Sequence, residues 1–371
     1  MSSKKDYSTG ARKIAYNFPR LTFVLIQINF WVIAILLFSF ITYTNSKYIV
    51  QLYDLNFPLS IYMTVFSALL SGIILGIFFG ILDLLLFKGG IQRLPSWLAI
   101  FLRVLLYPIG VLLIIIIIRY ILTDVVKTDY SIILDNPATW YYFYWSLLIY
   151  IAIMTAVISF INQMNNMFGP GVLIPLLMGR YRKPREEQRL FMFLDLKSSA
   201  TYAEELGHLD YSSMIRDCFM DLNKVLSKNY AEIYQYVGDE AVITWPVEEG
   251  VRKANCISLF FDFSERLNKR QAYYVKRYGM VPEFKAGLHL GIITAVEVGQ
   301  IKREIAYHGD TINTAARIQS ICNYYNKSFL ISESVRTVLH IPNLEYKIER
   351  LGEISLKGKI QAVEIFSVEL V

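Results

Sequence analysis

The stretch FMFLDLKSS (residues 191–199) is an apolar, strand-like run that delivers one carboxylate, Asp195, near its end. A second such run, IYQYV (233–237), leads directly into GDE (238–240) before the chain turns apolar again. A Gly-Asp turn between two strand-like runs is a hairpin signal. Hard divalent cations prefer oxygen ligands and are often held by one or two carboxylates plus substrate phosphates. We therefore expect Asp195 and Asp239 to share a divalent-metal site, with two ions as the default arrangement for phosphate chemistry.

Residues 190–371 have the length of one domain and alternate between strand-like and helix-like patterns. The order strand–helix–strand–strand–helix–strand predicts a ferredoxin-like α+β sandwich, in which the first strand lies beside the hairpin. That arrangement would bring Asp195 and Asp239 together despite their separation in sequence. The expected strands are 190–196, 231–237, 240–245, 283–293, 329–331 and 363–369, and the expected helices are roughly 199–228, 249–276, 310–325 and 332–338.

A second polar constellation lies in YHGDTINTAAR (307–317), where a glycine turn precedes a helix-like run. Asn313 and Arg317 are four residues apart, so they project from one helical face. An amide beside a guanidinium suits a ribose oxygen and a phosphate, and Arg suits charge that develops on a transferring phosphoryl group. Further on, LKGK (356–359) places Lys357 next to a glycine, which fits either a phosphate ligand or a solvated charge.

The first half of the chain has the composition of a membrane domain. Of the 371 residues, 54% are hydrophobic and only 18% are charged, which departs from soluble averages in both respects. Four runs are long enough to span a bilayer: 21–43, 60–87, 98–122 and 140–161. The net charge of +6 gathers at the ends of these runs, which indicates a lipid bilayer as partner and no nucleic acid.

Basic residues alternate between rich and poor segments, which predicts an integral protein of the plasma or inner membrane with both termini and the C-terminal domain in the cytoplasm. The expected organisation is a tail at 1–20, an all-α four-span bundle at 21–161, a connector at 162–189 and the α+β domain at 190–371. Asp83, Arg103 and Arg119 fall inside spans but near their ends, which favours snorkelling or a helix-end contact over a functional role.

Four motifs agree in order and spacing with the catalytic domain of class III nucleotide cyclases, the adenylyl and guanylyl cyclases. Each is weak alone, whereas the ordered set across 190–371 is specific. The chain therefore resembles this family, with a four-helix membrane anchor before the cyclase domain. The motifs are FLDL at 193–196, YVGDEAV at 236–242, HGDTINTAAR at 308–317 and LKGK at 356–359.

The resemblance implies that Asp195, Asp239 and the Leu196 carbonyl bind two Mg²⁺ or Mn²⁺ ions per active site. The implied reaction is attack of the ribose 3′-hydroxyl on the α-phosphorus of a nucleoside triphosphate, with release of pyrophosphate.

The same resemblance assigns the remaining site residues and a partner. Asn313 orients the ribose, Arg317 stabilises the transition state and Lys357 matches the family's phosphate-binding lysine. In this family one protomer supplies the metal aspartates and the other supplies the Asn and the Arg. A homodimer with two shared sites is therefore expected.

The chain departs from the family at the positions that select the base. Gln235 stands where adenylyl cyclases usually have Lys and guanylyl cyclases Glu, and Ala306 stands where adenylyl cyclases often have Asp or Thr. ATP is the leading expectation on family grounds, with a guanylate or pyrimidine nucleotide cyclase as the alternative. Two other classes are a non-catalytic receptor with a degenerate cyclase domain and a transporter with a regulatory domain. A degenerate domain should lack an Asp or the Asn/Arg pair, and the bundle lacks the paired midplane charges typical of transporters.

Overall fold

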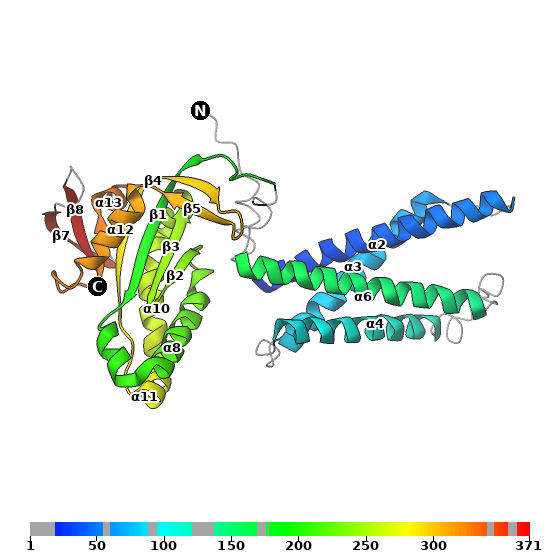
Figure 1. Cartoon of the computed structure of the whole chain (residues 1–371), viewed down its shortest axis with the longest axis horizontal. Helices are drawn as coiled ribbons and strands as arrows, with labels where there is room; N and C mark the ends of the chain where they lie inside the picture. Colours follow the sequence, from blue (N-terminus) through cyan, green and yellow to red (C-terminus); the bar gives the residue numbers. More distant parts are fainter. Residues whose placement is uncertain are drawn as a thin grey trace. The chain divides into compact units, whose positions relative to one another are not determined.

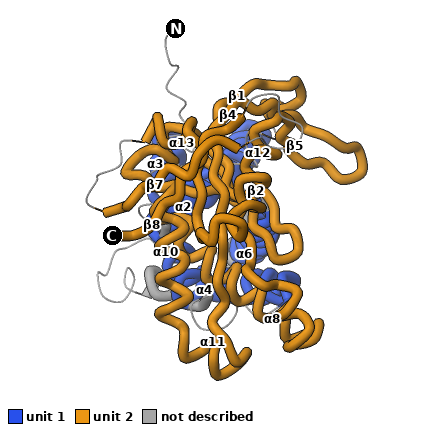
Figure 2. The backbone as a smooth tube through the Cα atoms, turned by 90° about the vertical axis from the view of Figure 1, so that its left-hand side faces the viewer, with its two compact units in different colours: residues 1–170 blue, residues 171–371 orange. Residues whose placement is uncertain are grey.

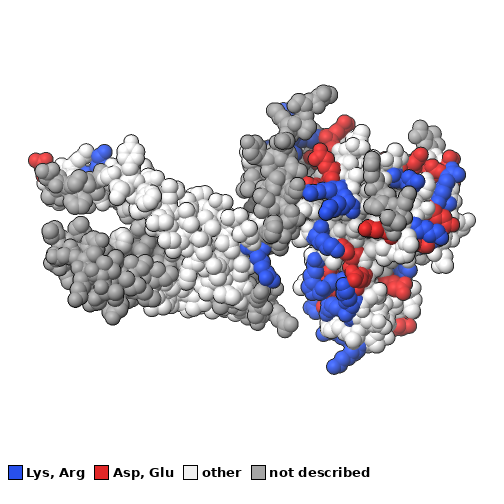
Figure 3. All heavy atoms as spheres, turned by 180° about the vertical axis from the view of Figure 1, so that it is seen from behind, with Lys and Arg blue, Asp and Glu red and all other residues white. Residues whose placement is uncertain are grey.

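The computed structural model describes residues 19–54, 60–87, 95–120, 137–168, 176, 178–339, 345–354 and 362–371. The chain divides into two compact units, residues 1–170 and 171–371 (Figure 2). Charged side chains gather on the second unit, whereas the described helices of the first unit present almost only uncharged residues (Figure 3). The surface of the first unit therefore suits an apolar environment, and the surface of the second suits water.

Among its described residues, the first unit has four helices that are long and apolar enough to cross a membrane (Figure 1). They confirm long apolar helices at the four runs where spans were expected, although the first extends beyond residue 43 and the last continues into the expected connector at 162–189. Their bounds are α2 Pro19–Leu52, α3 Ile61–Phe87, α4 Ser96–Tyr120 and α6 Pro137–Phe168.

Glycines spaced four apart bring α3 against α2. A Cβ at Gly76 would lie 2.4 Å from the Ile28 Cα, and one at Gly72 would lie 2.6 Å from the Val32 Cα. Small residues at this spacing let the backbones of membrane helices approach closely, which is a main source of their packing energy. The pattern is visible in the sequence as GIILGIFFG (72–80).

Asp83 and Arg103 form an ion pair between α3 and α4, with 3.0 Å between Arg103 Nε and Asp83 Oδ1. The Asp83 side chain is only 5% exposed, so of the two expected alternatives a contact near the helix ends, and not snorkelling, describes this residue. The physical reason is a partner of opposite charge on the neighbouring helix, since a charge in a membrane is tolerated best when it is paired within the bundle. The Arg119 side chain lies outside the described residues.

The second unit begins with the expected strand–helix–hairpin–helix–strand order. Its antiparallel core has the strand order β2-β3-β1-β4, which confirms the ferredoxin-like α+β arrangement. The elements of this core are β1 Arg185–Leu196, α8 Ser199–Leu226, β2 Glu232–Val237, β3 Glu240–Pro246, α10 Asn255–Lys269, α11 Gln271–Tyr278 and β4 Phe284–Val298. Strand β1 thus starts inside the expected connector, five residues before the predicted strand.

The sheet continues beyond this core. β6 (Phe329–Ser332) pairs with β4 in parallel, β8 (Val363–Leu370) follows it, and β7 (Tyr346–Ile354) lies at the edge. β5 (Glu304–His308) forms a hairpin with β4. Neither β5 nor β7 was expected from the sequence. Two shorter elements, α9 (Val247–Val251) and α13 (Glu333–Val338), complete the domain together with α12 (Asp310–Ser320).

Alternation along β1 assigns each side chain to one of the two faces of the sheet. Leu190, Met192, Leu194 and Leu196 join the main core under α8, α10 and α11. Phe191 and Phe193 join a second cluster that includes Ala315 of α12 on the opposite face. Burial of each large apolar side chain contributes about 1.5–3 kcal/mol, and a one-residue slip would exchange the faces. The register therefore fixes Asp195 on the α12 face.

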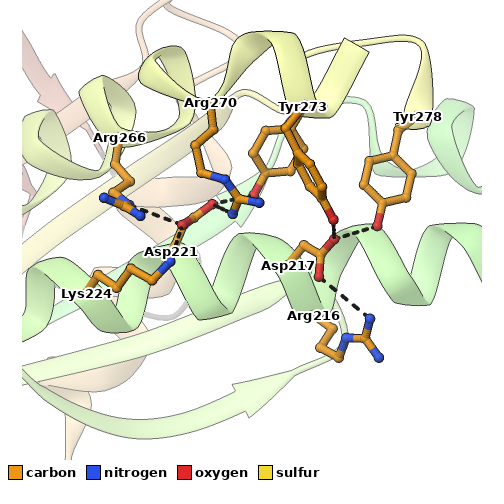
Figure 4. A network of polar contacts seen from close by, with 9 residues as sticks. Arg216, Asp217, Asp221, Lys224, Arg266, Arg270, Tyr273 and Tyr278 are labelled. Atoms are coloured by element: carbon orange, nitrogen blue, oxygen red, sulfur yellow. Dashed lines mark hydrogen bonds and ion pairs between the residues drawn. The ribbon is translucent and has the colours of Figure 1, made fainter. Parts of the chain in front are cut away.

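A polar network joins the helices of the layer that covers the main core (Figure 4). Asp221 of α8 is fully buried and accepts hydrogen bonds from Tyr274 at 2.8 Å and from Arg266 at 3.1 Å, with Arg270 also bound to it. One turn earlier, Asp217 accepts hydrogen bonds from the hydroxyls of Tyr273 and Tyr278. Although burial opposes ionisation, these donors lower the pKa of Asp221 below its usual value. Asp217 and Asp221 are therefore both held by donors from the neighbouring helices of this layer.

Candidate active site

Asp195 lies next to two charged neighbours in the sheet. It pairs in register with Glu240 on β3 and with Lys285 on β4. The Oδ2 atom of Asp195 accepts a hydrogen bond of 2.8 Å from Gln319 Nε2 and lies 3.4 Å from Lys285 Nζ. The carboxylate is thus held from one side by donors of β4 and α12.

Asp239 reaches the same place from the β2–β3 turn. Gly238 has φ of 60°, a left-handed conformation that glycine adopts without strain and that a tight hairpin turn needs. Asp239 Oδ2 is buried and has no hydrogen-bond partner among the described residues. An acceptor left bare in this way costs free energy unless a ligand satisfies it.

The carboxylates influence one another's ionisation. Burial and the negative charge of Asp239 raise the pKa of Asp195 above its usual value. Burial and the charges of Asp195 and Asp239 raise the pKa of Glu240 to about 7. Carboxylates crowded in this way favour a bound cation, since a cation removes their mutual repulsion.

The site fits divalent cations only with help from a substrate. In the described part of the chain, no three Asp, Glu, His or Cys side chains form a complete metal cluster. Asp195 and Asp239 would supply carboxylate oxygens, and Leu196, whose side chain is buried in the core, could contribute only its backbone carbonyl. Two carboxylates completed by phosphates are the usual donor set for Mg²⁺.

Helix α12 carries Asn313 and Arg317 on one side and Gln319 on the other. At about 100° per residue, Asn313 and Arg317 differ by about 40°, whereas Arg317 and Gln319 differ by about 200°. Gln319 is buried against the sheet, while Asn313 is exposed. Arg317 Nη1 is buried and has no hydrogen-bond partner within the described ranges. The Asn/Arg side of α12 therefore points away from the Asp195 of its own chain.

The base-selecting candidates lie on neighbouring strands. Gln235 is exposed on β2 opposite Val242, and Ala306 is half-buried on β5 opposite Val296. The rings of Tyr234 and Tyr307, the residues next to them, lie 4.8 Å apart between centroids. This ring contact brings the two neighbours together, and no contact among the described residues joins Gln235 to Ala306. Lys357 lies outside the described residues.

Among the residues beside the metal candidates, Glu240, Lys285 and Gln319 were not found from the sequence. Glu240 stands next to Asp239 in the hairpin, and its position was visible in the motif. Lys285 and Gln319 reach Asp195 only through the packing of β4 and α12, a contact that spans 124 residues for Gln319. No local sequence pattern predicts such a contact.

A ferredoxin-like sheet with two convergent aspartates and an Asn/Arg helix defines a nucleotide-cyclase type of catalytic domain. The family model of the adenylate and guanylate cyclase catalytic domain matches residues 182–369, and the chain belongs to this family.

Known proteins are similar to the chain over part of its length. Adenylate cyclase 2 of Rhizobium meliloti (strain 1021) is 37% identical over 222 residues, which are 60% of this chain and 61% of that protein. Adenylate cyclase 1 of the same organism is 26% identical over 182 residues, 48% of this chain and 27% of that protein. A solved bacterial light-regulated adenylyl cyclase has a TM-score of 0.51 at 16% identity, covering 59% of this chain and 63% of that one, which shows the fold alone. The chain thus spans less than two thirds of these relatives.

Proposed function

We propose that this chain is a membrane-bound nucleotide cyclase that converts a nucleoside triphosphate, ATP first among them, to the 3′,5′-cyclic monophosphate and pyrophosphate. The observation that carries the proposal is the convergence of Asp195 and Asp239, with the buried Asp239 Oδ2 lacking a partner among the described residues. ATP is favoured because the relative at 37% identity is named an adenylate cyclase. Gln235 can donate and accept hydrogen bonds to a base edge, so it is compatible with adenine.

The residues divide the work of phosphoryl transfer between holding cations and binding the nucleotide. Asp195, Asp239 and the Leu196 carbonyl would hold two Mg²⁺ or Mn²⁺ ions, which would lower the pKa of the ribose 3′-hydroxyl and bind the triphosphate. Asn313 orients the ribose by hydrogen bonding. Arg317 stabilises the charge that develops on the phosphoryl group.

A homodimer completes each site in this proposal. Within one chain Arg317 and Gln319 lie on opposite sides of α12, and Gln319 is the one that contacts Asp195. A second copy related by a two-fold axis can present its Asn313 and Arg317 to these aspartates, and the symmetry then creates two equivalent sites. Lys357 is proposed to bind phosphate in the same site.

The membrane unit is proposed to anchor the enzyme with the catalytic domain in the cytoplasm. The four apolar helices support membrane insertion. Lysine and arginine in the N-terminal tail and at 180–185 support the orientation, because cytoplasmic segments carry the excess of basic residues.

A product assay tests the function. The purified full chain is incubated with Mn²⁺ and, separately, with ATP, GTP, CTP or UTP, and the cyclic products and pyrophosphate are identified by mass spectrometry. We expect cyclic AMP from ATP, its loss in Asp195→Asn, and its retention in Asp262→Asn, a carboxylate of α10 that is paired with Lys228.

Each contrary result of this assay has one meaning. If no cyclic product formed from any of the four triphosphates, the proposal that the chain is an enzyme would be overturned and a non-catalytic receptor favoured. Wild-type turnover by Asp195→Asn would overturn the metal assignment.

A further inference from the structure

We propose that Gln319 and Lys285 are positioning residues that hold Asp195 for cation binding, and that Gln319 ties this aspartate to the helix that serves the other active site of the dimer. The proposal rests on the proposed function and adds two residues to it. Neither residue touches the nucleotide in this proposal, because both act through Asp195.

Both donors contact the same oxygen of Asp195. Gln319 Nε2 donates to Oδ2 at 2.8 Å, and Lys285 Nζ lies 3.4 Å from that same atom. Oδ1 is therefore the oxygen that remains for a cation shared with Asp239. Hydrogen bonds to ligating carboxylates orient the ligand and tune its affinity for the metal.

Solvent competes weakly for these contacts. The Lys285 side chain is 12% exposed and the Asp195 side chain 23%. Gln319 is 6% exposed, so its amide has few other partners. Hydrogen bonds that involve a charged group are stronger than those between neutral groups. Two such contacts suffice to select one rotamer of Asp195.

Packing fixes the backbone of Gln319. A Cβ at Gly287 of β4 would lie 2.2 Å from the Gln319 N and 2.7 Å from the Ala315 O. Glycine at 287 therefore allows α12 to lie directly on β4, and Gly287 is paired in register with Phe193 of β1. The amide of Gln319 is thus delivered at a fixed distance from the end of β1.

The link to the other site follows from the geometry of α12. Gln319 lies on the sheet side of α12, and Asn313 and Arg317 lie on the opposite side. In the proposed dimer one α12 therefore contacts the metal aspartate of one site and offers Arg317 to the other. A shift of α12 would displace one residue in each of the two sites, because Gln319 and Arg317 are only two residues apart.

Direct Mn²⁺ binding tests the positioning role without turnover. Binding to the full chain is measured by electron paramagnetic resonance in the presence of 3′-deoxy-ATP, which lacks the attacking hydroxyl. We expect Gln319→Met and Lys285→Met each to weaken Mn²⁺ binding about 10–100-fold, as loss of such partners does at other metal sites. Gln188→Met, an exposed position on β1, should leave binding unchanged.

Two outcomes separate the alternatives. Unchanged Mn²⁺ affinity in folded Gln319→Met and Lys285→Met would overturn the proposal, even if melting temperature fell. Gln319→Asn keeps the amide but withdraws it by one methylene, so it serves if the Met variant does not fold, and it should also weaken Mn²⁺ binding. Normal Mn²⁺ binding by a wild-type protein that forms no cyclic product would refute the proposed function and leave the positioning role standing.

Mixed dimers test the link between sites. One chain carries Arg317→Ala and the other Asp239→Asn, so that a single site keeps all its residues. Gln319→Met placed in the Arg317→Ala chain should raise the Mn²⁺ concentration for half-maximal activity about tenfold or more. Placed in the Asp239→Asn chain, it should lower kcat and leave that concentration unchanged. Equal effects from the two placements would overturn the link.

Discussion

In the helix layer of the catalytic domain, the buried Asp221 is bound by Tyr274, Arg266, Arg270 and Lys224, whereas on the α12 face two buried polar atoms remain bare. These atoms are Asp239 Oδ2 and Arg317 Nη1, and neither has a hydrogen-bond partner among the described residues. Both regions belong to the same domain and both contain buried charge. The Asp221 network and these two atoms differ in whether the chain itself supplies the hydrogen-bond partners.

The difference separates stability from function. A buried charge with its own partners is tolerated by the fold, and removing one member of the network leaves the others buried and unsatisfied. A buried polar atom without a partner weakens the fold unless a ligand, an ion or a water completes it. Substitutions in the helix layer should therefore change stability, and substitutions on the α12 face should change activity.

The largest effect is expected for Arg317→Ala. Loss of an arginine that stabilises a transferring phosphoryl group lowers kcat by about a thousandfold or more. The melting temperature should stay unchanged, because no described contact is lost. Turnover of ATP with Mn²⁺ and a thermal melt of the same preparation measure both quantities. A large fall in melting temperature with little loss of kcat would show that Arg317 serves stability and not activity.

A smaller effect, on stability alone, is expected in the apolar core under the helix layer. Phe263 is fully buried and packs edge-on against Phe284 at 5.0 Å between ring centroids. Phe263→Ala should cost about 3–5 kcal/mol, a fall of about 10 °C in melting temperature. Tyr324→Ala, at a side chain that is 83% exposed, is the control and should leave the melting temperature in place. If Phe263→Ala melted like wild type, the core assignment would be wrong.

The polar network should contribute less than the apolar core. Asp221→Asn removes the charge that Arg266, Arg270 and Lys224 share, at a cost of about 2 kcal/mol and therefore about 5 °C. The control is Asp210→Asn, an exposed position on α8. Thermal melts of both variants test this prediction. Equal melting temperatures for the two would show that the network does not contribute to stability.

The smallest effect concerns pH and Glu240. Its pKa in the folded protein is about 7, above the usual 4.5, so the folded state holds a proton that the unfolded chain has already lost. Stability contributed by this group is present at low pH and is lost as pH rises through about 7. In metal-free protein, the melting temperature of Glu240→Gln relative to that of wild type should therefore rise between pH 5 and pH 8, by a few degrees at most. A constant difference in melting temperature across this range would contradict it.

Local signals in the sequence were enough to predict that Asp195 and Asp239 lie close together. One aspartate ends an apolar strand, and the other sits in a Gly-Asp turn that must form a hairpin. The ferredoxin-like order of elements then places the two strands side by side. The contacts of Gln319 and Lys285 could not be predicted, because they depend on how closely α12 packs on β4 at Gly287.

The missed elements have physical causes as well. β7 contains a register shift between Arg350 and Gly352, which breaks the alternation that identifies a strand. The single helix expected at 249–276 is interrupted at Lys253 and Ala254, whose φ angles are 50° and 54°. Neither residue is a glycine, so composition carries no sign of the break.

Complementation of two inactive variants tests the central claim that one chain supplies the metal aspartates and its partner the arginine. Asp239→Asn and Arg317→Ala are expressed separately and together, and cyclic AMP formation is measured for each preparation. We expect each variant alone to be inactive. The coexpressed pair should recover about a quarter of wild-type activity, because half of the dimers are mixed and each mixed dimer has one intact site of two. A coexpressed pair as inactive as its parents would contradict the shared site.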